Sequence, residues 1–308
     1  MSKIKKAIKN PGYALHVIAS QYMKVDLRAK VFAHALEYRS DSENGNYASA
    51  VMHSLKNQKA FDNFKRSHSY RDILEHVSED QGRSYLDILE DRNDSILSRG
   101  LSTVLISDQV GNPIKYHYAR YENPLSPTTL RYLKVSSDLK ILFGSSLGQV
   151  AEIGCGYGGQ TLVNDQLLDV QSARLFDLPF VCKLIDRYLN AHLLIGAYAT
   201  TSINKEEPRD YDLVISNYAF SELPKTLQLA YIKKVLSKSN KGYLTMNSGL
   251  GNARSTGKLT LSELAELLPE FRMIEEDPLT SDTNYIIVWG HSEDALEKHF
   301  KHFKPLKA

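Results

Sequence analysis

The sequence predicts an α/β fold in which a doubly wound, seven-stranded sheet follows a helical N-terminal region. After Gly148, short apolar segments alternate with segments of helical spacing, as in a largely parallel sheet with helices on both faces. The first apolar segment runs directly into closely spaced glycines, Gly154, Gly156 and Gly159, and then a helix. Before Arg99, apolar residues instead recur at spacings of three and four, which is typical of helices. We therefore predict a Rossmann-like domain preceded by a bundle of short helices.

The helical bundle is predicted over residues 2–99. Its apolar spacing is clearest in two groups, Leu27, Val31, Phe32, Ala35 and Leu36, and then Tyr85, Ile88, Leu89, Ile96 and Leu97. Between Thr103 and Tyr121 the pattern changes to two β-like pieces, 104–106 and 114–118, with a Gly-Asn-Pro turn at 111–113. This segment is therefore predicted to form a hairpin or a linker.

The remaining elements are predicted from caps and from alternation. Ser126 and Pro127 are residue types of an N-cap and a first helical position, and they predict a helix that stops at Gly144. The predicted strands are 150–153, 173–176, 193–197, 211–216, 243–246, 271–275 and 285–289. The predicted helices between them are 159–168, 180–190, 225–237 and 261–268. Thr260 and Glu263 have capping-box spacing for the last of these helices.

These elements divide the chain into four predicted parts. The parts are an N-terminal helical region (1–100), a hairpin or linker with one helix (101–148), the Rossmann-like domain (149–291) and a basic helical tail (292–308). The third part contains every predicted strand of the sheet. We expect the ligand site there.

Composition and charge exclude several classes of protein. With 42% hydrophobic and 24% charged residues, the chain has the profile of an ordinary globular protein. A net charge of +2, from 38 basic and 36 acidic side chains, does not call for a nucleic-acid partner. Cys155 and Cys182 are too few for a disulfide scaffold, so a cytoplasmic location is expected. The sequence contains no run of about 20 apolar residues, so no transmembrane helix is predicted. His299 and His302 lie in a lysine-rich tail and are interpreted as solvated, so no metal site is predicted.

The N-terminus combines basic and apolar residues. Lys3, Lys5, Lys6 and Lys9 precede an apolar stretch over residues 13–22. One hypothesis is peripheral association with an anionic membrane at its inner face, which would suit a lipid-linked substrate. The alternative, a solvated end of a bundle helix, is favoured because four lysines are at the weak end for surface binding.

The glycine-rich segment after the first strand is the most informative part of the chain. It places a tight turn at the carboxyl end of a strand, where open α/β sheets bind ligands. Gly154, Gly156 and Gly159 fit the dinucleotide fingerprint, and Asp177 follows at the expected distance. Glu152, however, lies two residues before the first glycine, where its carboxylate would repel a pyrophosphate but not the cationic S-adenosylmethionine. The charge therefore favours the methyl donor, although a strand-end glutamate also occurs as a solvated or capping group.

Asp177 ends the second predicted strand. A carboxylate at this place accepts hydrogen bonds from the ribose hydroxyls of a bound nucleotide. Its alternative role is local, because Leu178 and Pro179 begin a helix and an acid there complements the helix dipole. The two roles are compatible, and we assign Asp177 and Leu178 to the predicted cofactor site.

The string Glu-Ile-Gly-Cys-Gly-Tyr-Gly-Gly-Gln at 152–160 resembles motif I of class I S-adenosylmethionine-dependent methyltransferases, especially the bacterial sugar O-methyltransferase family. Further matches to that family lie at 108–113, 130–132, 176–179 and 216–223, and at 242–244 together with Asn247. The string Asn-Tyr-Ala-Phe-Ser-Glu-Leu at 217–223 is the narrowest of them. The resemblance covers about residues 100–290 and leaves the N-terminal helices without a match.

The resemblance implies a Rossmann-like seven-stranded methyltransferase domain. The predicted cofactor-binding residues are Glu152, Gly154, Gly156, Gly158, Asp177, Leu178, Asn217 and Tyr218. The implied reaction transfers a methyl group to a hydroxyl of a sugar in a surface polysaccharide or a glycolipid. Two rivals remain open, namely an NAD-dependent oxidoreductase that uses the same glycines and a non-catalytic nucleotide-binding module of the same fold.

Two side chains are candidates for the general base. Glu222 follows the fourth strand and would lie near the transferred methyl group if its loop folds over the cleft; its alternative role is a first-turn carboxylate before the helix after Pro224. His117, on a β-like piece among tyrosines, is the second candidate, although a lone histidine there is usually on the surface. Asn217 and Tyr218 end the fourth strand at the predicted cleft, where turn geometry alone would also favour asparagine.

Overall fold

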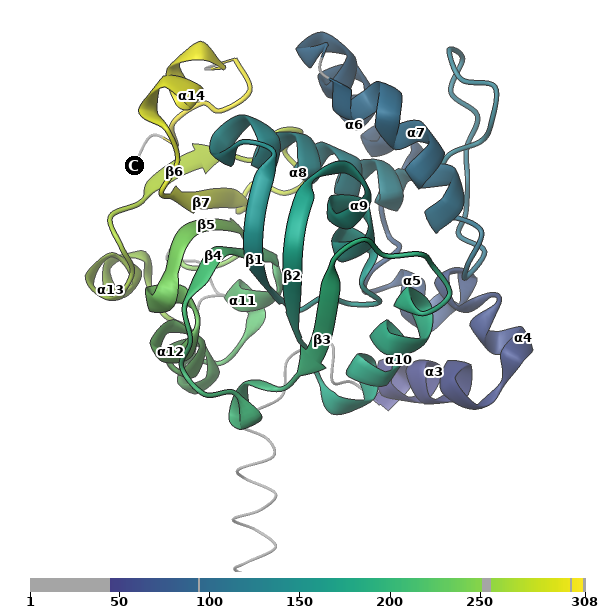
Figure 1. Cartoon of the computed structure of the whole chain (residues 1–308), viewed down its shortest axis with the longest axis horizontal. Coiled ribbons are helices and arrows are strands. Elements are labelled where there is room, and N and C mark those ends of the chain that lie inside the picture. The colour runs from purple at the N-terminus through teal and green to yellow at the C-terminus, as the bar shows by residue number, and fades with distance from the viewer. Residues whose placement is uncertain (1–44, 94, 251–255, 300, 307–308) are drawn as a thin grey trace, which may run out of the picture. The chain divides into compact units, whose positions relative to one another are not determined.

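Seven strands form a single mixed sheet in the computed structural model (Figure 1). The structure describes residues 45–93, 95–250, 256–299 and 301–306. The strands are β1 (Ser146–Ile153), β2 (Asp169–Phe176), β3 (Ala197–Thr201), β4 (Tyr211–Asn217), β5 (Ser239–Met246), β6 (Arg272–Glu275) and β7 (Tyr285–Trp289). The predicted seven-stranded α/β fold is confirmed.

The strand order in the sheet is β3-β2-β1-β4-β5-β7-β6. The first five strands are parallel, whereas β7 is antiparallel to both β5 and β6. The classic dinucleotide-binding order is 3-2-1-4-5-6, so the insertion of antiparallel β7 sets this sheet apart. Because β1 and β4 are neighbours that lead to opposite halves of the sheet, the switch point lies at their carboxyl ends.

The third strand begins four residues later than its predicted start at residue 193. Leu193 and Ile195, which suggested a strand, are 91% and 80% exposed. The carboxylate of Asp165 accepts hydrogen bonds from the backbone N–H groups of Ile195 and Gly196, at 2.8 and 2.7 Å. These N–H groups are therefore satisfied by a side chain rather than by β2, and pairing with β2 starts only at Ala197.

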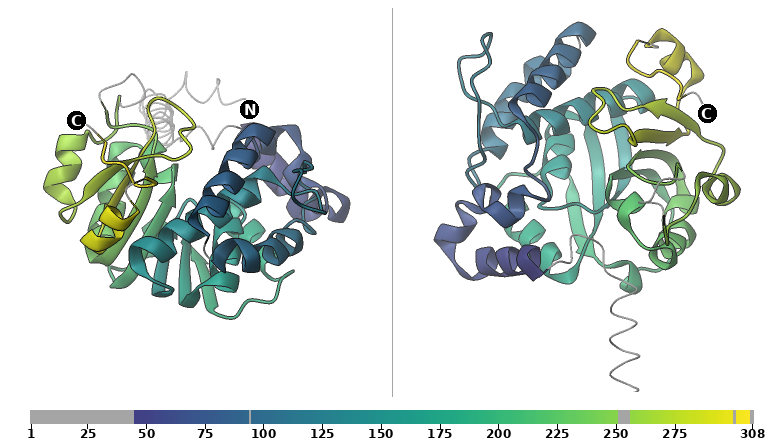
Figure 2. Two further views of the ribbon diagram at one scale, coloured as in Figure 1. Left: turned by 90° about the horizontal axis from the view of Figure 1, so that it is seen from above. Right: turned by 180° about the vertical axis from the view of Figure 1, so that it is seen from behind.

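Helices cover both faces of the sheet. The first face packs against α8 (Pro127–Phe143), α9 (Gly159–Leu167), α10 (Pro179–Leu189) and the N-terminal helices, and the second against α11 (Ala219–Glu222), α12 (Lys225–Lys234) and α13 (Leu261–Leu267). Alternate residues of β1 take part in the two cores, since Val150 belongs to the first and Ala151 and Ile153 to the second, as the period of a strand requires. Figure 2 shows the blue N-terminal and the light green C-terminal helices on different sides of the sheet.

The described N-terminal helices join the first core. They are α3 (Gly45–Lys56), α4 (Gln58–Phe61), α5 (His68–Arg71), α6 (Glu79–Arg92) and α7 (Ser95–Ser107), with a short 3-10 turn at Phe64–Arg66. Tyr85, Leu89 and Ile96 are buried as their helical spacing predicts. The group from Leu27 to Leu36 and the basic N-terminus with its membrane hypothesis lie outside the described residues.

The predicted β-like piece at 104–106 is wrong, because these residues belong to α7. Ile96, Gly100 and Val104 are spaced four apart and buried, so they form one face of a helix. This face packs so closely on α8 that a Cβ at Gly100 would lie 2.1 Å from the Leu133 side chain. Tertiary packing thus overrides the local β preference of 104–106. The second piece forms no strand and contributes only an isolated bridge between Tyr116 and Leu125.

Two helix starts follow the predicted caps. The Ser126 side chain accepts a hydrogen bond from the Thr129 N–H, Pro127 is in the first turn, and the helix ends before Gly144. Thr260 and Glu263 form the predicted capping box of α13. Each such cap satisfies N–H groups that the first turn of a helix leaves without partners.

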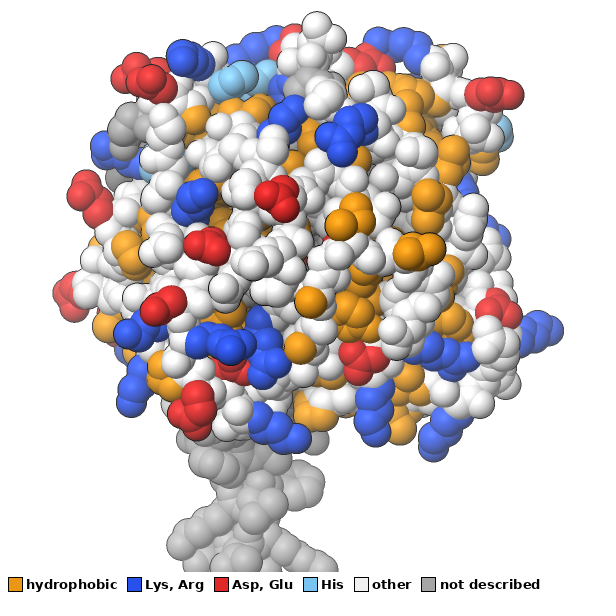
Figure 3. Space-filling view, in the orientation of Figure 1, with side chains coloured by type: hydrophobic (Ala, Val, Ile, Leu, Met, Phe, Trp, Pro, Cys, Tyr) orange, Lys and Arg blue, Asp and Glu red, His pale blue; other side chains and the backbone are white. Residues whose placement is uncertain are grey.

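The described surface carries charges of both signs. On the face shown in Figure 3, basic and acidic side chains are interspersed. A last helix, α14 (Glu293–Lys298), begins the C-terminal tail, and a bridge between Ile274 and Pro305 ties the tail to β6. Among the described helices, none has the length and apolar character needed to cross a membrane.

Candidate functional site

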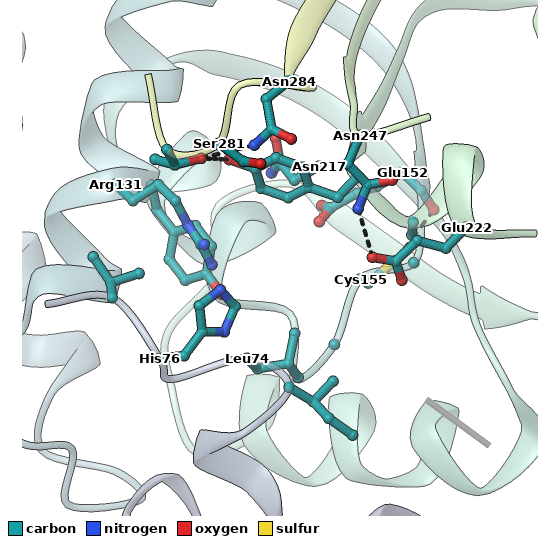
Figure 4. Close-up of a pocket in the computed structure, with 18 of the residues that line it drawn as sticks. Leu74, His76, Arg131, Glu152, Cys155, Asn217, Glu222, Asn247, Ser281 and Asn284 are labelled. Carbon is teal, nitrogen blue, oxygen red and sulfur yellow. Dashed lines mark hydrogen bonds between the residues drawn. The ribbon is translucent and has the colours of Figure 1, made fainter. Parts of the chain in front are cut away.

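A cavity of about 300 Å³ lies at the carboxyl ends of β1, β2, β4 and β5. This is the edge at which open α/β sheets bind ligands, and the volume is within the range of small-molecule sites. Figure 4 shows that its walls come from the strand ends, from segments that precede β1 and from the segment between β6 and β7. Of the predicted site residues, seven line it: Glu152, Gly154, Gly156, Asp177, Asn217, Tyr218 and Glu222.

The glycine loop forms the floor of the cavity. Gly154 has a φ of 73°, and a Cβ there would lie 2.0 Å from the Ala219 Cβ, so the loop after β1 and the start of α11 approach as closely as only glycine permits. Gly156 has a φ of 59°, and a Cβ there would meet the Leu74 side chain at 3.0 Å. Gly158 is the residue before α9 and does not line the cavity. The loop therefore presents bare backbone to the cavity at Gly154 and Gly156.

Gly156→Val is expected to remove nucleoside binding and to cost about 1–3 kcal/mol of stability, because a β-branched residue is strained at positive φ. The matched control is Gly144→Val, since Gly144 has a φ of 85° but a Cβ there would meet no atom within 4 Å. Calorimetric titration and thermal melting of both variants separate the two effects. Equal loss of nucleoside affinity in both variants would show that strain, and not position in the cavity, explains the result.

Two carboxylates stand on either side of this loop. Glu152, near the end of β1, is only 4% exposed, and burial raises its pKa to about 7, an increase to which the charge of Asp177 adds. Burial likewise raises the pKa of Asp177 to about 6, against the N–H groups of Leu178 and Gly156, which lower it. Both groups are therefore partly protonated near neutral pH. A cationic or hydroxyl-bearing ligand would stabilise their ionised forms.

Asp177 already organises the backbone around the loop. One oxygen accepts a hydrogen bond from the Gly156 N–H at 3.0 Å, and the other accepts one from the Leu178 N–H at 2.7 Å. Leu178 is the residue before α10 and does not line the cavity. Since a carboxylate has about four acceptor positions, Asp177 retains capacity for ligand hydroxyls.

The end of β4 supplies polar groups to the opposite wall. Asn217 donates from Nδ2 to Gln160 Oε1 at 3.3 Å, while its buried Oδ1 accepts no hydrogen bond in the described structure. Tyr218 has a φ of 67°, an uncommon conformation for a non-glycine residue that is often found at functional sites. The free acceptor of Asn217 and the strained backbone of Tyr218 both mark this turn as ligand-facing.

The Tyr218 ring is held by the segment between β6 and β7. Its hydroxyl donates to the carboxylate of Glu276. Glu276 in turn accepts hydrogen bonds from the Thr280 N–H at 2.8 Å and from Asn284 Nδ2 at 3.1 Å. Thr280 and Asn284 also line the cavity, so this network fixes one wall of the site.

Glu222, the last residue of α11, lies in the cavity wall. Asn247, at the end of β5, donates from Nδ2 to Glu222 Oε1 at 2.9 Å (Figure 4). Asn247 is itself held by Ser221, whose hydroxyl donates to Asn247 Oδ1 at 2.7 Å. The carboxylate is thus oriented by Asn247, which follows β5 and is held by Ser221 of α11.

His117 is exposed and is not among the residues that line the cavity. The β-like piece predicted for the segment between α7 and α8, which carries His117, forms only an isolated bridge between Tyr116 and Leu125. A different histidine, His76, lines the cavity. Burial and the positive charge of Arg131 lower its pKa below the ordinary histidine value.

Sequence reasoning missed the wall formed by the N-terminal helices and by α8. This wall consists of Tyr47, Ile73, Leu74, His76, Val77, Gln81, Tyr85, Arg131 and Tyr132. Only Leu130-Arg131-Tyr132 carried a signal, as one of the matches to the methyltransferase family. Among the described residues, no group of three His, Cys, Asp or Glu side chains is placed to hold a metal ion.

No family model and no curated protein matches the chain. Parts of it superpose on solved structures of low similarity. The pyocyanin biosynthetic protein PhzM is 12% identical with a TM-score of 0.40, over 54% of this chain and 58% of PhzM. The N-methyltransferase NodS from Bradyrhizobium japonicum, solved with S-adenosylhomocysteine, is 16% identical with a TM-score of 0.40, over 52% of this chain and 85% of NodS.

The O-methyltransferase NcsB1 of neocarzinostatin biosynthesis, solved with S-adenosylmethionine and a naphthoic acid, is 15% identical with a TM-score of 0.36. The aligned part covers 53% of this chain and 57% of NcsB1. In two of these three comparisons the match thus spans less than two thirds of the other protein. Identities and TM-scores of this size do not assign a family or an activity to this chain.

Proposed function

We propose that the protein is an S-adenosylmethionine-dependent O-methyltransferase. The observation that carries the proposal is the pair of carboxylates, Glu152 and Asp177, beside a glycine loop at the switch point of the sheet. A cationic donor would be attracted to Glu152, whereas the pyrophosphate of a dinucleotide would be repelled. The antiparallel β7 also differs from the classic dinucleotide-binding sheet. Both observations favour the methyl donor over NAD.

The residues of the cavity fit such a donor. Asp177 would accept hydrogen bonds from the ribose hydroxyls, and the bare backbone of Gly154 and Gly156 would allow close approach. Glu152 would face the ammonium group of the methionine part, and the free Oδ1 of Asn217 would accept a hydrogen bond from it or from the acceptor. When bound, the donor supplies an electrophilic methyl group on a sulfonium ion.

Glu222 is the proposed general base. It would accept the proton of the attacking hydroxyl. General-base catalysis of this kind typically raises the rate by a factor of about 10²–10⁴. Asn247 holds its Oε1 in place, so the carboxylate needs no reorientation before it acts. The apolar side chains of Ile73, Leu74 and Val77 line the cavity on the N-terminal side and would limit the access of water to the reacting groups.

The proposed acceptor is a sugar hydroxyl of a surface polysaccharide or a glycolipid. The resemblance over residues 100–290 supports this class. The cavity lining supports it too, because it combines an aromatic ring, Tyr85, with the polar side chains of Gln81, Ser281 and Asn284, which suits a ligand with an apolar face and many hydroxyls. Association with an anionic membrane through the N-terminal lysines remains a prediction.

Asp177→Ala is expected to weaken binding of S-adenosylhomocysteine by about 1.5–3 kcal/mol, the value for hydrogen bonds to a charged group. Calorimetric titration measures the affinity. Asp186→Ala is the control, because Asp186 accepts a hydrogen bond from Thr200 outside the cavity. Unchanged affinity in Asp177→Ala would remove Asp177 from the proposed site.

The transfer reaction is tested by incubating the protein with methyl-labelled S-adenosylmethionine and a bacterial glycan extract, followed by mass analysis of the released sugars. The proposal predicts a methyl ether on a sugar hydroxyl. A protein that binds the nucleoside tightly but labels no class of hydroxyl would support the rival of a non-catalytic binding module.

A further inference from the structure

The cavity contains a guanidinium group that forms no ion pair in the described part of the chain, although the charge of the buried Glu75 acts on it from a greater distance. Arg131 is in α8 and lines the cavity. No described carboxylate forms an ion pair with it, and its Nε is buried without a hydrogen-bond partner. Its neighbours are the rings of Tyr132 and Tyr218, whose centroids lie 5.6 and 5.9 Å from the guanidinium carbon. Aromatic faces attract a cation but do not replace its counter-ion.

Two other arginines of the chain with little exposure are paired directly. Arg92 lies 2.7 Å from a carboxylate oxygen of Asp138, with both side chains fully buried. Arg174 lies 2.6 Å from a carboxylate oxygen of Glu206. Removing a charge from water without a partner costs free energy, so buried charges are normally paired. Lys65 and Arg187 also form no ion pair in the described structure, but each donates hydrogen bonds to backbone carbonyl oxygens. Arg131 instead faces a cavity, where a ligand can supply the missing partner.

The surroundings of Arg131 also fix its orientation. Figure 4 shows the Arg131 guanidinium and the His76 imidazole beside each other, with Glu222 on the opposite side of the cavity. Tyr218 is held by Glu276, so the ring against the guanidinium is itself immobilised. A planar guanidinium in a fixed orientation donates two parallel hydrogen bonds to a carboxylate.

We propose that Arg131 binds a carboxylate of a bound ligand. This inference rests on the proposed function, which offers two sources of that group. The first is the α-carboxylate of the donor's methionine part, in which case Glu152 and Arg131 together match both charges of an amino acid. The second is an acidic group on the acceptor, such as that of a uronic acid.

The donor as the source is tested by Arg131→Gln with two nucleosides. S-adenosylhomocysteine carries the amino-acid part, whereas 5′-methylthioadenosine has the same nucleoside and thioether without it. If the donor is the source, the affinity for S-adenosylhomocysteine falls about tenfold to a hundredfold, and the affinity for methylthioadenosine does not change. Arg83→Gln, which removes an exposed arginine of α6 paired with Glu79, is expected to leave both affinities unchanged.

The acceptor as the source is tested on the complex with S-adenosylhomocysteine. If Arg131→Gln retains full affinity for the nucleoside, glucuronate and glucose are titrated into both complexes. Binding of glucuronate, but not of glucose, that is lost in Arg131→Gln would assign the carboxylate to the acceptor. The proposal is overturned if Arg131→Gln binds S-adenosylhomocysteine as the wild type does and no glucuronate binding depends on Arg131. A wild type that binds neither nucleoside contradicts the proposed function, and this inference with it.

Thermal melting without ligand distinguishes a binding role from a structural one. Arg131→Met removes a charge that no described carboxylate pairs, so its melting temperature is expected to equal or exceed that of the wild type. Arg92→Met is the matched control, because it leaves Asp138 without its arginine and is expected to lower the melting temperature. If the melting temperature falls as much in Arg131→Met as in Arg92→Met, Arg131 stabilises the fold and has a structural role instead.

Discussion

Glu222→Gln is expected to bind S-adenosylhomocysteine as the wild type does and to lose a factor of about 10²–10⁴ in turnover. The amide keeps the shape of the side chain in the cavity wall, and its oxygen still accepts the hydrogen bond from Asn247. What it loses is the basic carboxylate. Nucleoside titration and the rate of labelled methyl transfer, measured on the same preparation, give the two quantities.

Two histidine variants control this experiment. His117→Asn is expected to turn over near the wild-type rate, because His117 is exposed and does not line the cavity. His76→Asn addresses the histidine that does. If His76 were the base, its variant would show the large loss, and wild-type activity would rise with pH through a pKa below the ordinary histidine value, since burial and Arg131 lower it. Near-normal turnover in Glu222→Gln would exclude Glu222 as the base.

Glu152→Gln is expected to stabilise the ligand-free protein and to weaken donor binding. Burial raises the pKa of Glu152 from 4.5 to about 7. Between these values the folded state binds more protons than the unfolded state, so the contribution of Glu152 to stability falls as pH rises through this window. The gain from glutamine is therefore at most about 3 kcal/mol above pH 7 and small near pH 4.5. Melting curves at pH 8 and pH 5 measure the difference.

Donor affinity is expected to change in the opposite direction. In Glu152→Gln, loss of the carboxylate that is proposed to face the ammonium group should lower the affinity for S-adenosylhomocysteine about tenfold to a hundredfold at pH 8. In the wild type, affinity should rise with pH as Asp177 and then Glu152 lose their protons, with pKa values of about 6 and about 7. In Glu152→Gln the upper part of this rise should disappear.

Glu206→Gln is the matched control for stability. Glu206 is as buried as Glu152, and both carboxylates accept a hydrogen bond from a hydroxyl, of Tyr211 and Thr161 respectively, but only Glu206 also forms an ion pair, with Arg174. Its replacement should therefore destabilise the protein at pH 8 and leave donor affinity unchanged. A Glu152→Gln variant that melts below the wild type at pH 8 would show that the Glu152 carboxylate, which accepts a hydrogen bond from Thr161 but has no ion pair in the described structure, stabilises the fold rather than serving a ligand.

The donor side of the site was predictable because its residues follow local rules. A strand that runs into glycines places Glu152, Gly154 and Gly156 at a strand end, and the carboxylate at the next strand end, Asp177, reaches the same edge. The misplaced third strand and the missed extent of α7 have a common cause. Apolar runs such as Leu193–Ile195 are ambiguous until hydrogen bonds, here from the backbone to Asp165, decide where pairing begins.

The opposite wall of the site was not predictable from local sequence. His76 and Tyr85 reach the cavity only because the N-terminal helices pack on the sheet. No residue spacing in the sequence predicts that contact. The anchor of Tyr218 is equally remote, since Glu276 lies 58 residues further along the chain. Arg131 became notable only when the structure showed a cation that lines the cavity and forms no ion pair in the described part of the chain.

The central claim is that the paired carboxylates and the glycine loop bind a cationic methyl donor rather than a dinucleotide. Calorimetric titration of the wild-type protein with S-adenosylhomocysteine and, in parallel, with NAD tests it most directly. We expect one molecule of S-adenosylhomocysteine bound per chain with a dissociation constant in the micromolar range or below, and no comparable binding of NAD. Preferential binding of NAD, or no binding of S-adenosylhomocysteine, would contradict it.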